Sequence, residues 1–215
     1  MIETDTTPSL AEFLSGVAKH KMTVRMESGI YRHLWFAEPG TGNRHFALTT
    51  WPGYLAITGD MGAFTFTRVE DMFEFFRAKP SHGLAINPGY WAEKAVAVDR
   101  NGGLTKFSPE KARNVVTDGA AEGWEPPVDM KRVESEVFSE LDSGEHAFRT
   151  ALQNFEDYTG TRVRFPFSDH CEWNFHEYDF HFIWCLYAIV WGIQQYDRAA
   201  SATQGDREGA KGAGT

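Results

Sequence analysis

The feature that most constrains the fold is a four-residue turn signal, Gly59-Asp-Met-Gly62, between two β-prone runs at residues 54–58 and 63–67. Runs of this kind on either side of a glycine-rich turn are typical of a β-hairpin. In the second run Phe64 and Phe66 alternate with threonine, so one face of the hairpin is predicted to be apolar and the other polar. The rest of the chain must therefore extend this hairpin into a sheet and cover its apolar face.

The same period-two pattern extends back to residue 21. Apolar and polar residues alternate over residues 22–26, 31–37 and 46–49, and a loop rich in proline and glycine separates the last two runs. Ahead of them, Ser9 and Glu12 match a capping box, which predicts a short amphipathic helix. The pattern therefore predicts one helix and then four or five antiparallel strands in meander order.

Helical spacing replaces this alternation after the hairpin. An apolar stripe predicts an amphipathic helix over residues 69–76. Asn87 and Pro88 are typical of the N-cap and first position of a second helix, whose apolar face would contain Trp91, Ala95 and Val98. Ser108 and Pro109 start a third helix in the same way, and helical spacing returns in the last third of the chain.

These elements predict an α+β fold. We expect a single α+β domain over residues 1–200, in which several helices cover an N-terminal antiparallel β-meander of four to five strands. A long buried C-terminal helix is predicted from about residue 178 to about residue 200. Residues 201–215 contain no large apolar side chain, which predicts a disordered C-terminal tail.

Composition narrows the classes of partner. The net charge of −9 argues against a nonspecific nucleic-acid binder, so no direct DNA binding is expected. The most apolar run, from Phe182 to Ile193, is shorter than the roughly 20 residues that a membrane span needs, so no membrane partner is expected. The acidic, polar start does not match a signal peptide, and two cysteines make no disulfide framework. We therefore expect a cytoplasmic protein.

Acidic residues are concentrated between residues 122 and 145, where Lys131 and Arg132 are the only basic residues. This pattern predicts either an ordinary solvated helix face or an acidic face for docking on a protein partner. The residues proposed for such a docking face are Glu134, Glu136 and Glu140.

Residues with metal-binding side chains gather just before the last helix. Imidazole, thiolate and carboxylate groups are the usual ligands of zinc, and His170, Cys171, Glu177 and His181 could supply them. If the helix already includes Glu177, then Glu177, His181 and Cys185 lie on one stripe at i, i+4 and i+8. The alternative is a polar patch that orders the start of a buried helix and holds no cofactor, because no recognised zinc spacing is present.

Two loop tips could contact a ligand. Asp60 lies at the tip of the hairpin, although aspartate is also a good turn former. His82 and Tyr90 lie beside the predicted N-terminus of the second helix, where a small nucleotide could bind. No residue is predicted to be catalytic, because the chain has no nucleophile motif and Cys185 sits within the most apolar helix.

Four strings, GDMGAFTF, DMFEFFR, INPGYWAEKAVAVDR and FIWCLYAIVWGIQQYD, resemble a family of uncharacterised bacteriophage and prophage proteins. The resemblance covers about residue 51 to residue 197 and carries no activity or catalytic residue with it. It implies a phage accessory protein that acts in the bacterial cytoplasm, where proteins of this kind often inhibit host defences such as CRISPR–Cas. The first hypothesis is therefore a non-enzymatic inhibitor that docks on a host protein complex. A nucleotide-signal sponge and a metal-dependent enzyme are the alternatives.

Overall fold

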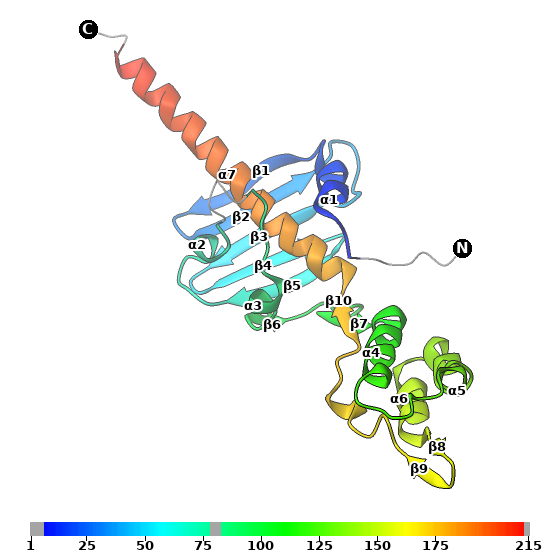
Figure 1. Cartoon of the computed structure of the whole chain (residues 1–215). Helices are drawn as coiled ribbons and strands as arrows, with labels where there is room; N and C mark the ends of the chain where they lie inside the picture. The colour runs from blue at the N-terminus through cyan, green and yellow to red at the C-terminus, as the bar shows by residue number, and fades with distance from the viewer. Residues whose placement is uncertain (1–6, 78–82, 213–215) are drawn as a thin grey trace. The chain divides into compact units, whose positions relative to one another are not determined.

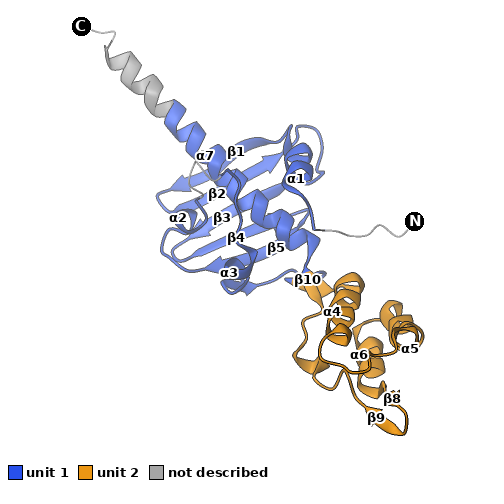
Figure 2. Cartoon of the chain, viewed as in Figure 1, with its two compact units in different colours: residues 1–104, 178–215 blue, residues 105–177 orange. Residues whose placement is uncertain are grey.

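The computed structural model describes residues 7–77 and 83–212, with side chains described as far as residue 202. The chain forms two compact units (Figure 2): unit 1 combines Met1–Leu104 with Tyr178–Thr215, and unit 2 is Thr105–Glu177. The single domain predicted over residues 1–200 is therefore replaced by two units. The division arises because the helices of unit 2 enclose a hydrophobic core of their own.

Unit 1 is built on a six-stranded antiparallel meander in the order β1 to β6 (Figure 1). The first five strands confirm the α+β prediction and its β-meander. Their bounds are β1 (Lys21–Ser28), β2 (Tyr31–Ala37), β3 (Phe46–Trp51), β4 (Tyr54–Gly59) and β5 (Gly62–Thr67). Each pairs with the next in sequence, and the hairpin around residues 59–62 joins β4 to β5.

The sixth strand, β6 (Ala95–Ala97), lies where the sequence pattern predicted a helix. The second helix, α3 (Pro88–Ala92), has the predicted Asn87 cap but ends before Ala95. The amide of Thr67 donates to the carbonyl of Lys94 at 3.0 Å, which attaches this segment to the edge of β5. The β-branched side chains of Val96 and Val98 favour a strand here, and both are exposed instead of lying on an apolar helix face.

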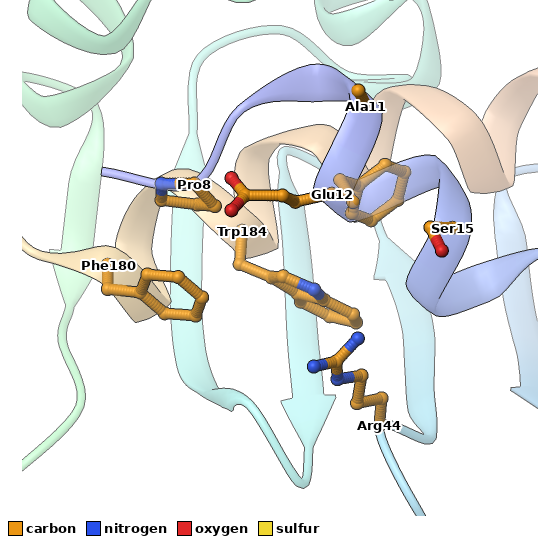
Figure 3. A pocket seen from close by; sticks show the side chains of 8 residues that line it. Pro8, Ala11, Glu12, Ser15, Arg44, Phe180 and Trp184 are labelled. Atoms are coloured by element: carbon orange, nitrogen blue, oxygen red, sulfur yellow. The ribbon is translucent and has the colours of Figure 1, made fainter. Parts of the chain in front are cut away.

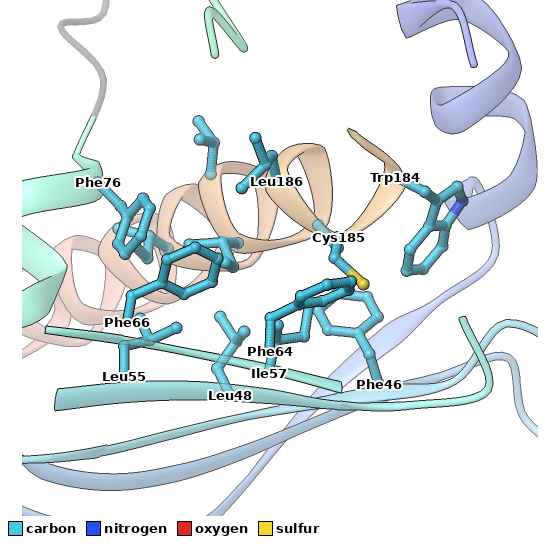
Figure 4. Close-up of a cluster of buried hydrophobic side chains, with 14 of the residues drawn as sticks. Phe46, Leu48, Leu55, Ile57, Phe64, Phe66, Phe76, Trp184, Cys185 and Leu186 are labelled. Carbon is cyan, nitrogen blue, oxygen red and sulfur yellow. The ribbon is translucent and has the colours of Figure 1, made fainter. Parts of the chain in front are cut away.

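The last helix, α7 (Phe180–Gly212), crosses one face of this sheet (Figure 1). We call that side of the sheet the inner face. Inner-face side chains such as Phe46, Leu48 and Phe66 form one buried cluster with Trp184 and Cys185 of α7, and all are fully or almost fully buried (Figure 4). The predicted long buried helix is confirmed, although it ends at Gly212 and not near residue 200. No helix in the described part of the chain is both long and apolar enough to span a membrane.

Three short helices complete the core of unit 1, among them α3 with the buried Trp91. The capping box of Ser9 and Glu12 is present at the start of α1 (Leu10–Val17), which buries Phe13 and Val17. The helix α2 (Met72–Phe76) begins later than predicted because the Asp71 side chain caps it by accepting a hydrogen bond from the Phe73 amide at 3.0 Å. Val69 lies before the helix and is exposed.

Unit 2 is mostly helical. Its helices are α4 (Pro109–Ala121), capped by Ser108 as predicted, α5 (Met130–Glu136) and α6 (Glu145–Asn154), with 3₁₀ turns η2 (Phe138–Ser143) and η3 (His170–Glu172). The strands β8 (Asp157–Thr159) and β9 (Arg162–Arg164) pair with each other, and β7 (Thr105–Phe107) pairs with β10 (His176–Tyr178). Phe148, Leu152, Phe167 and Phe175 are among the buried residues of its core.

Candidate functional site

The predicted acidic face lies in unit 2, and two of its three glutamates are paired with arginines. Glu134 accepts a hydrogen bond from Arg113 at 2.6 Å. Glu136 accepts two from Arg132, at 2.7 and 2.8 Å, and Glu140 is half-buried in η2. Arg113 lies outside the acidic segment in sequence, so composition alone could not reveal this neutralisation. The face therefore presents less negative charge to a partner than its sequence indicates.

The proposed metal ligands do not form the helical stripe that the sequence suggested. Glu177 lies in β10, and α7 begins only at Phe180, because the Asp179 carboxylate accepts a hydrogen bond from the His181 amide at 2.8 Å and caps the helix. His170 Nδ1 lies 2.9 Å from the carbonyl of Phe167. Within the described residues, no group of three or more His, Cys, Asp or Glu side chains is arranged to hold a metal ion.

The two cysteines have different environments. Cys171 is exposed, whereas Cys185 is buried in α7 with its Sγ 3.4 Å from the carbonyl of Met61. Burial raises the pKa of the Cys185 thiol strongly. A thiol in this environment is a packing group, because the thiolate is the reactive form.

The loop-tip residues are engaged within the protein. The Asp60 carboxylate accepts a hydrogen bond from the backbone amide of Arg44 at 2.8 Å. Tyr90 is 40 % exposed, and the Lys94 Nζ lies 4.8 Å from the centre of its ring. The helix that carries Tyr90 has only five residues, which is too short for a strong dipole. His82 lies outside the described residues.

The most distinctive surface of unit 1 is the side of the sheet that faces away from α7, which we call the outer face. Every sheet residue in the unit 1 core cluster points to the inner face. Strand alternation therefore points the opposite set of side chains of β1–β5 away from this cluster, and among them Ala47 is buried. The centre of this outer face consists of small residues in paired positions. They are Ala47, Thr49, Ala56, Thr58, Ala63, Thr65 and Thr67.

Two aromatic stacks border this patch of small residues. The ring of Trp35 stacks on the His45 ring with 4.9 Å between centroids, and the Cζ atom of Arg25 lies over the Trp35 ring, 4.9 Å from its centroid. Trp51 stacks on its cross-strand partner Tyr54 with centroids 5.3 Å apart and planes 14° apart. Stacked aromatic groups hold their side chains in fixed positions, so little conformational entropy is lost when a partner covers them.

The charge of the outer face differs in sign from that of the whole chain. Its positions on β1–β5 include Lys21, Arg25 and His33, and none is an Asp or Glu. Glu27 of β1 pairs with Arg32 on the inner side. A chain with a net charge of −9 thus has a sheet face without carboxylates.

The alternation of Phe and Thr in β5 predicts one core face and one polar face that is either exposed or covered differently. Within the described part of unit 1, the core helices pack against the inner face. Comparisons of the chain with protein-family models, with curated proteins and with solved structures give no match. The interpretation of the outer face therefore depends on its own geometry and chemistry.

Proposed function

We propose that this protein is a non-enzymatic binding protein that docks on another protein through the outer face of the unit 1 sheet. The observation that carries this proposal is a patch of small Ala and Thr side chains, on the side of the sheet opposite the α7 core, next to two aromatic stacks. Small residues let a partner approach the sheet closely, and aromatic residues dominate the energetics of protein interfaces.

The partner surface is acidic. Lys21, Arg25 and His33 lie on the outer face without any carboxylate among the outer-face positions of β1–β5. A second copy of the same chain would place like charges against each other, which is unfavourable. A single-stranded nucleic acid would need free ring faces for base stacking, but the Trp35 ring is already in contact with the His45 ring and the Arg25 guanidinium.

The role that fits the sequence resemblance is that of a phage accessory protein in the bacterial cytoplasm. There it would inhibit an antiviral defence system, such as CRISPR–Cas, by occupying an acidic surface of a host protein complex. In this proposal the outer face takes the docking role that the sequence assigned to Glu134, Glu136 and Glu140, because Glu134 and Glu136 are paired with arginines.

Removing the Trp51–Tyr54 stack tests this proposal. In bacteria that carry an active CRISPR–Cas system, the wild-type protein is expected to raise the plaquing efficiency of a targeted phage. The double variant Trp51→Ala with Tyr54→Ala is expected to lose that effect, with affinity for the captured complex at least about tenfold weaker. The matched control, Glu134→Lys with Glu136→Lys in unit 2, is expected to keep it.

Thermal unfolding of both variants checks that they remain folded. Failure of the wild-type protein to protect phage against any defence system tried would contradict the inhibitor role. Equal binding of a host complex by the wild type and the Trp51/Tyr54 variant would contradict the outer face as the docking surface.

Reversing the charge of the outer face gives a separate prediction. Arg25→Glu is expected to slow association with the acidic partner several-fold and to weaken its dependence on salt, since charges at an interface act mainly through the association rate. Association kinetics at low and high salt measure this effect. An unchanged association rate would show that the partner is not acidic.

A further inference from the structure

Unit 1 contains a cavity that the proposed docking surface does not use. It lies between α1 and the first turns of α7 and has a volume of about 480 Å³. Phe13, Phe180 and Trp184 supply its apolar walls, and Glu12, Ser15 and Arg44 supply polar groups (Figure 3). This size and this mixture of apolar walls with few polar groups are typical of small-molecule sites.

Arg44 is held in an unusual backbone conformation at this cavity. Its φ is 54°, the only positive φ of a non-glycine residue in the described chain. The Arg44 amide donates to Asp60 at 2.8 Å, and its carbonyl lies 2.9 Å from His20 Nε2. Such strain is retained where surrounding bonds enforce it, often at ligand sites. Asp60 thus helps to hold the backbone of Arg44 in this conformation.

The side chain of Arg44 passes over a residue that has no side chain. A Cβ atom at Gly16 would lie 2.3 Å from Nη1 of Arg44. Among the described residues, no hydrogen-bond or ion-pair partner accepts from this guanidinium. Gly16 therefore leaves room for an unpaired cation at the wall of the cavity.

The cavity has opposite charges at its two ends. Figure 3 shows the Glu12 carboxylate toward Pro8 and Phe180, and the Arg44 guanidinium at the far end beside the Trp184 ring. Oε2 of Glu12 accepts hydrogen bonds from the Ser9 amide and hydroxyl at 2.8 and 2.7 Å, and these bonds lower the Glu12 pKa. Oε1 makes no hydrogen bond to any described residue, so an ionised acceptor oxygen is left for a ligand.

We propose that this cavity binds a small nucleotide of the mononucleotide class. The planar base packs against Phe180 and donates an N–H to Oε1 of Glu12, while the phosphate accepts from Arg44 and from the hydroxyl of Ser15. Arginine presents a fork of donors that matches phosphate. A free amino acid fits poorly, since its ammonium and carboxylate share one carbon whereas the charges here lie at opposite ends. The site is independent of the outer face.

Calorimetric titration and thermal shift with four probes test the proposal. The four probes are 5′-AMP, 5′-GMP, one parent nucleoside (adenosine) and inorganic phosphate. At least one nucleotide is expected to bind more tightly than its nucleoside by about tenfold or more, and to raise the melting temperature. A nucleotide that binds no better than its nucleoside or than phosphate alone would overturn the proposal.

Two variants place the binding at this cavity. Arg44→Gln is expected to reduce nucleotide affinity to that of the nucleoside. Gly16→Ala is expected to hold or raise stability, because alanine favours the helix, yet to lower nucleotide affinity by displacing the guanidinium. The outer-face variant Trp51→Ala with Tyr54→Ala should bind nucleotide like the wild type. Wild-type nucleotide affinity in both cavity variants would refute the site.

Discussion

Replacing Asp71 with alanine is expected to lower the free energy of unfolding of unit 1 by about 3 kcal/mol. Arg32 lies on the inner face of the sheet with its side chain only 9 % exposed, and it donates two hydrogen bonds of 2.9 Å to Asp71. Removing the carboxylate leaves a buried guanidinium without its counter-charge and removes the cap of α2. The loss lies at the lower end of the range for broken buried pairs because the Asp71 side chain is 23 % exposed.

Denaturant unfolding followed by circular dichroism measures this loss. The chain offers a matched control, since Asp197 accepts the same two-bond pairing from Arg77, with both side chains more than a third exposed. Asp197→Ala is expected to cost about 1 kcal/mol or less. If Asp71→Ala and Asp197→Ala lowered the free energy of unfolding equally, burial of the Arg32–Asp71 pair would not be the cause of the larger loss. Arg32→Met combined with Asp71→Leu is expected to recover most of the lost stability.

The Arg32–Asp71 pair also makes the free energy of unfolding of unit 1 depend on pH in the acid range. Burial disfavours the charged form of Asp71, but the hydrogen bonds from Arg32 and from the Phe73 amide outweigh it, so its pKa is lowered. A lowered pKa means stability that is present above the unfolded-state value of about 3.9 and is lost as the pH falls through the folded-state value. Asp71→Asn is expected to remove this component, so its unfolding free energy should fall less than that of the wild type in acid.

Much of this architecture follows from local sequence patterns. Period-two alternation locates five strands, and the capping residues Ser9 and Ser108 locate two helix starts. Alternation and capping each depend on residues a few positions apart, so a short stretch of sequence is enough to predict them. The Arg32–Asp71 pair is different, because its members lie 39 positions apart. Alternation with Leu34 and Phe36 places Arg32 on the inner face, but no pattern within β2 shows that the carboxylate of Asp71 lies there to pair with it.

The candidate sites depend on long-range contacts even more strongly. The acidic segment predicted a docking face, but Arg113 of α4 neutralises Glu134 from 21 positions away. The ligand-rich segment predicted a helical stripe, but Asp179 starts the helix after Glu177. The sequence predicts Asp60 as a turn former or a ligand contact at the hairpin tip, whereas its hydrogen bond to the strained Arg44 depends on the loop before β3. The outer face and the cavity both depend on where the helices of unit 1 pack against the sheet. Local sequence patterns do not contain that information.

Replacing Gly59 with alanine is expected to destabilise unit 1 by about 3 kcal/mol, at the upper end of ordinary overpacking costs. A Cβ atom at this position would lie 2.2 Å from the carbonyl oxygen of His45 and 2.7 Å from the Cα of Phe46. Both atoms belong to backbone. They cannot move aside without shifting Phe46, whose ring packs against Phe36 with centroids 4.6 Å apart.

The control for this prediction is Gly53, in the turn between β3 and β4. It has a φ of 81° but no atom within 4 Å of an added Cβ, so Gly53→Ala tests left-handed strain without a clash and is expected to cost about 1–2 kcal/mol. Equal costs in the two variants would contradict the role of close approach. The His45 carbonyl that crowds Gly59 also accepts the Asp60 amide at 3.0 Å. Gly59→Ala should therefore disturb the Asp60–Arg44 contact and weaken nucleotide binding. Gly53→Ala should leave nucleotide affinity unchanged.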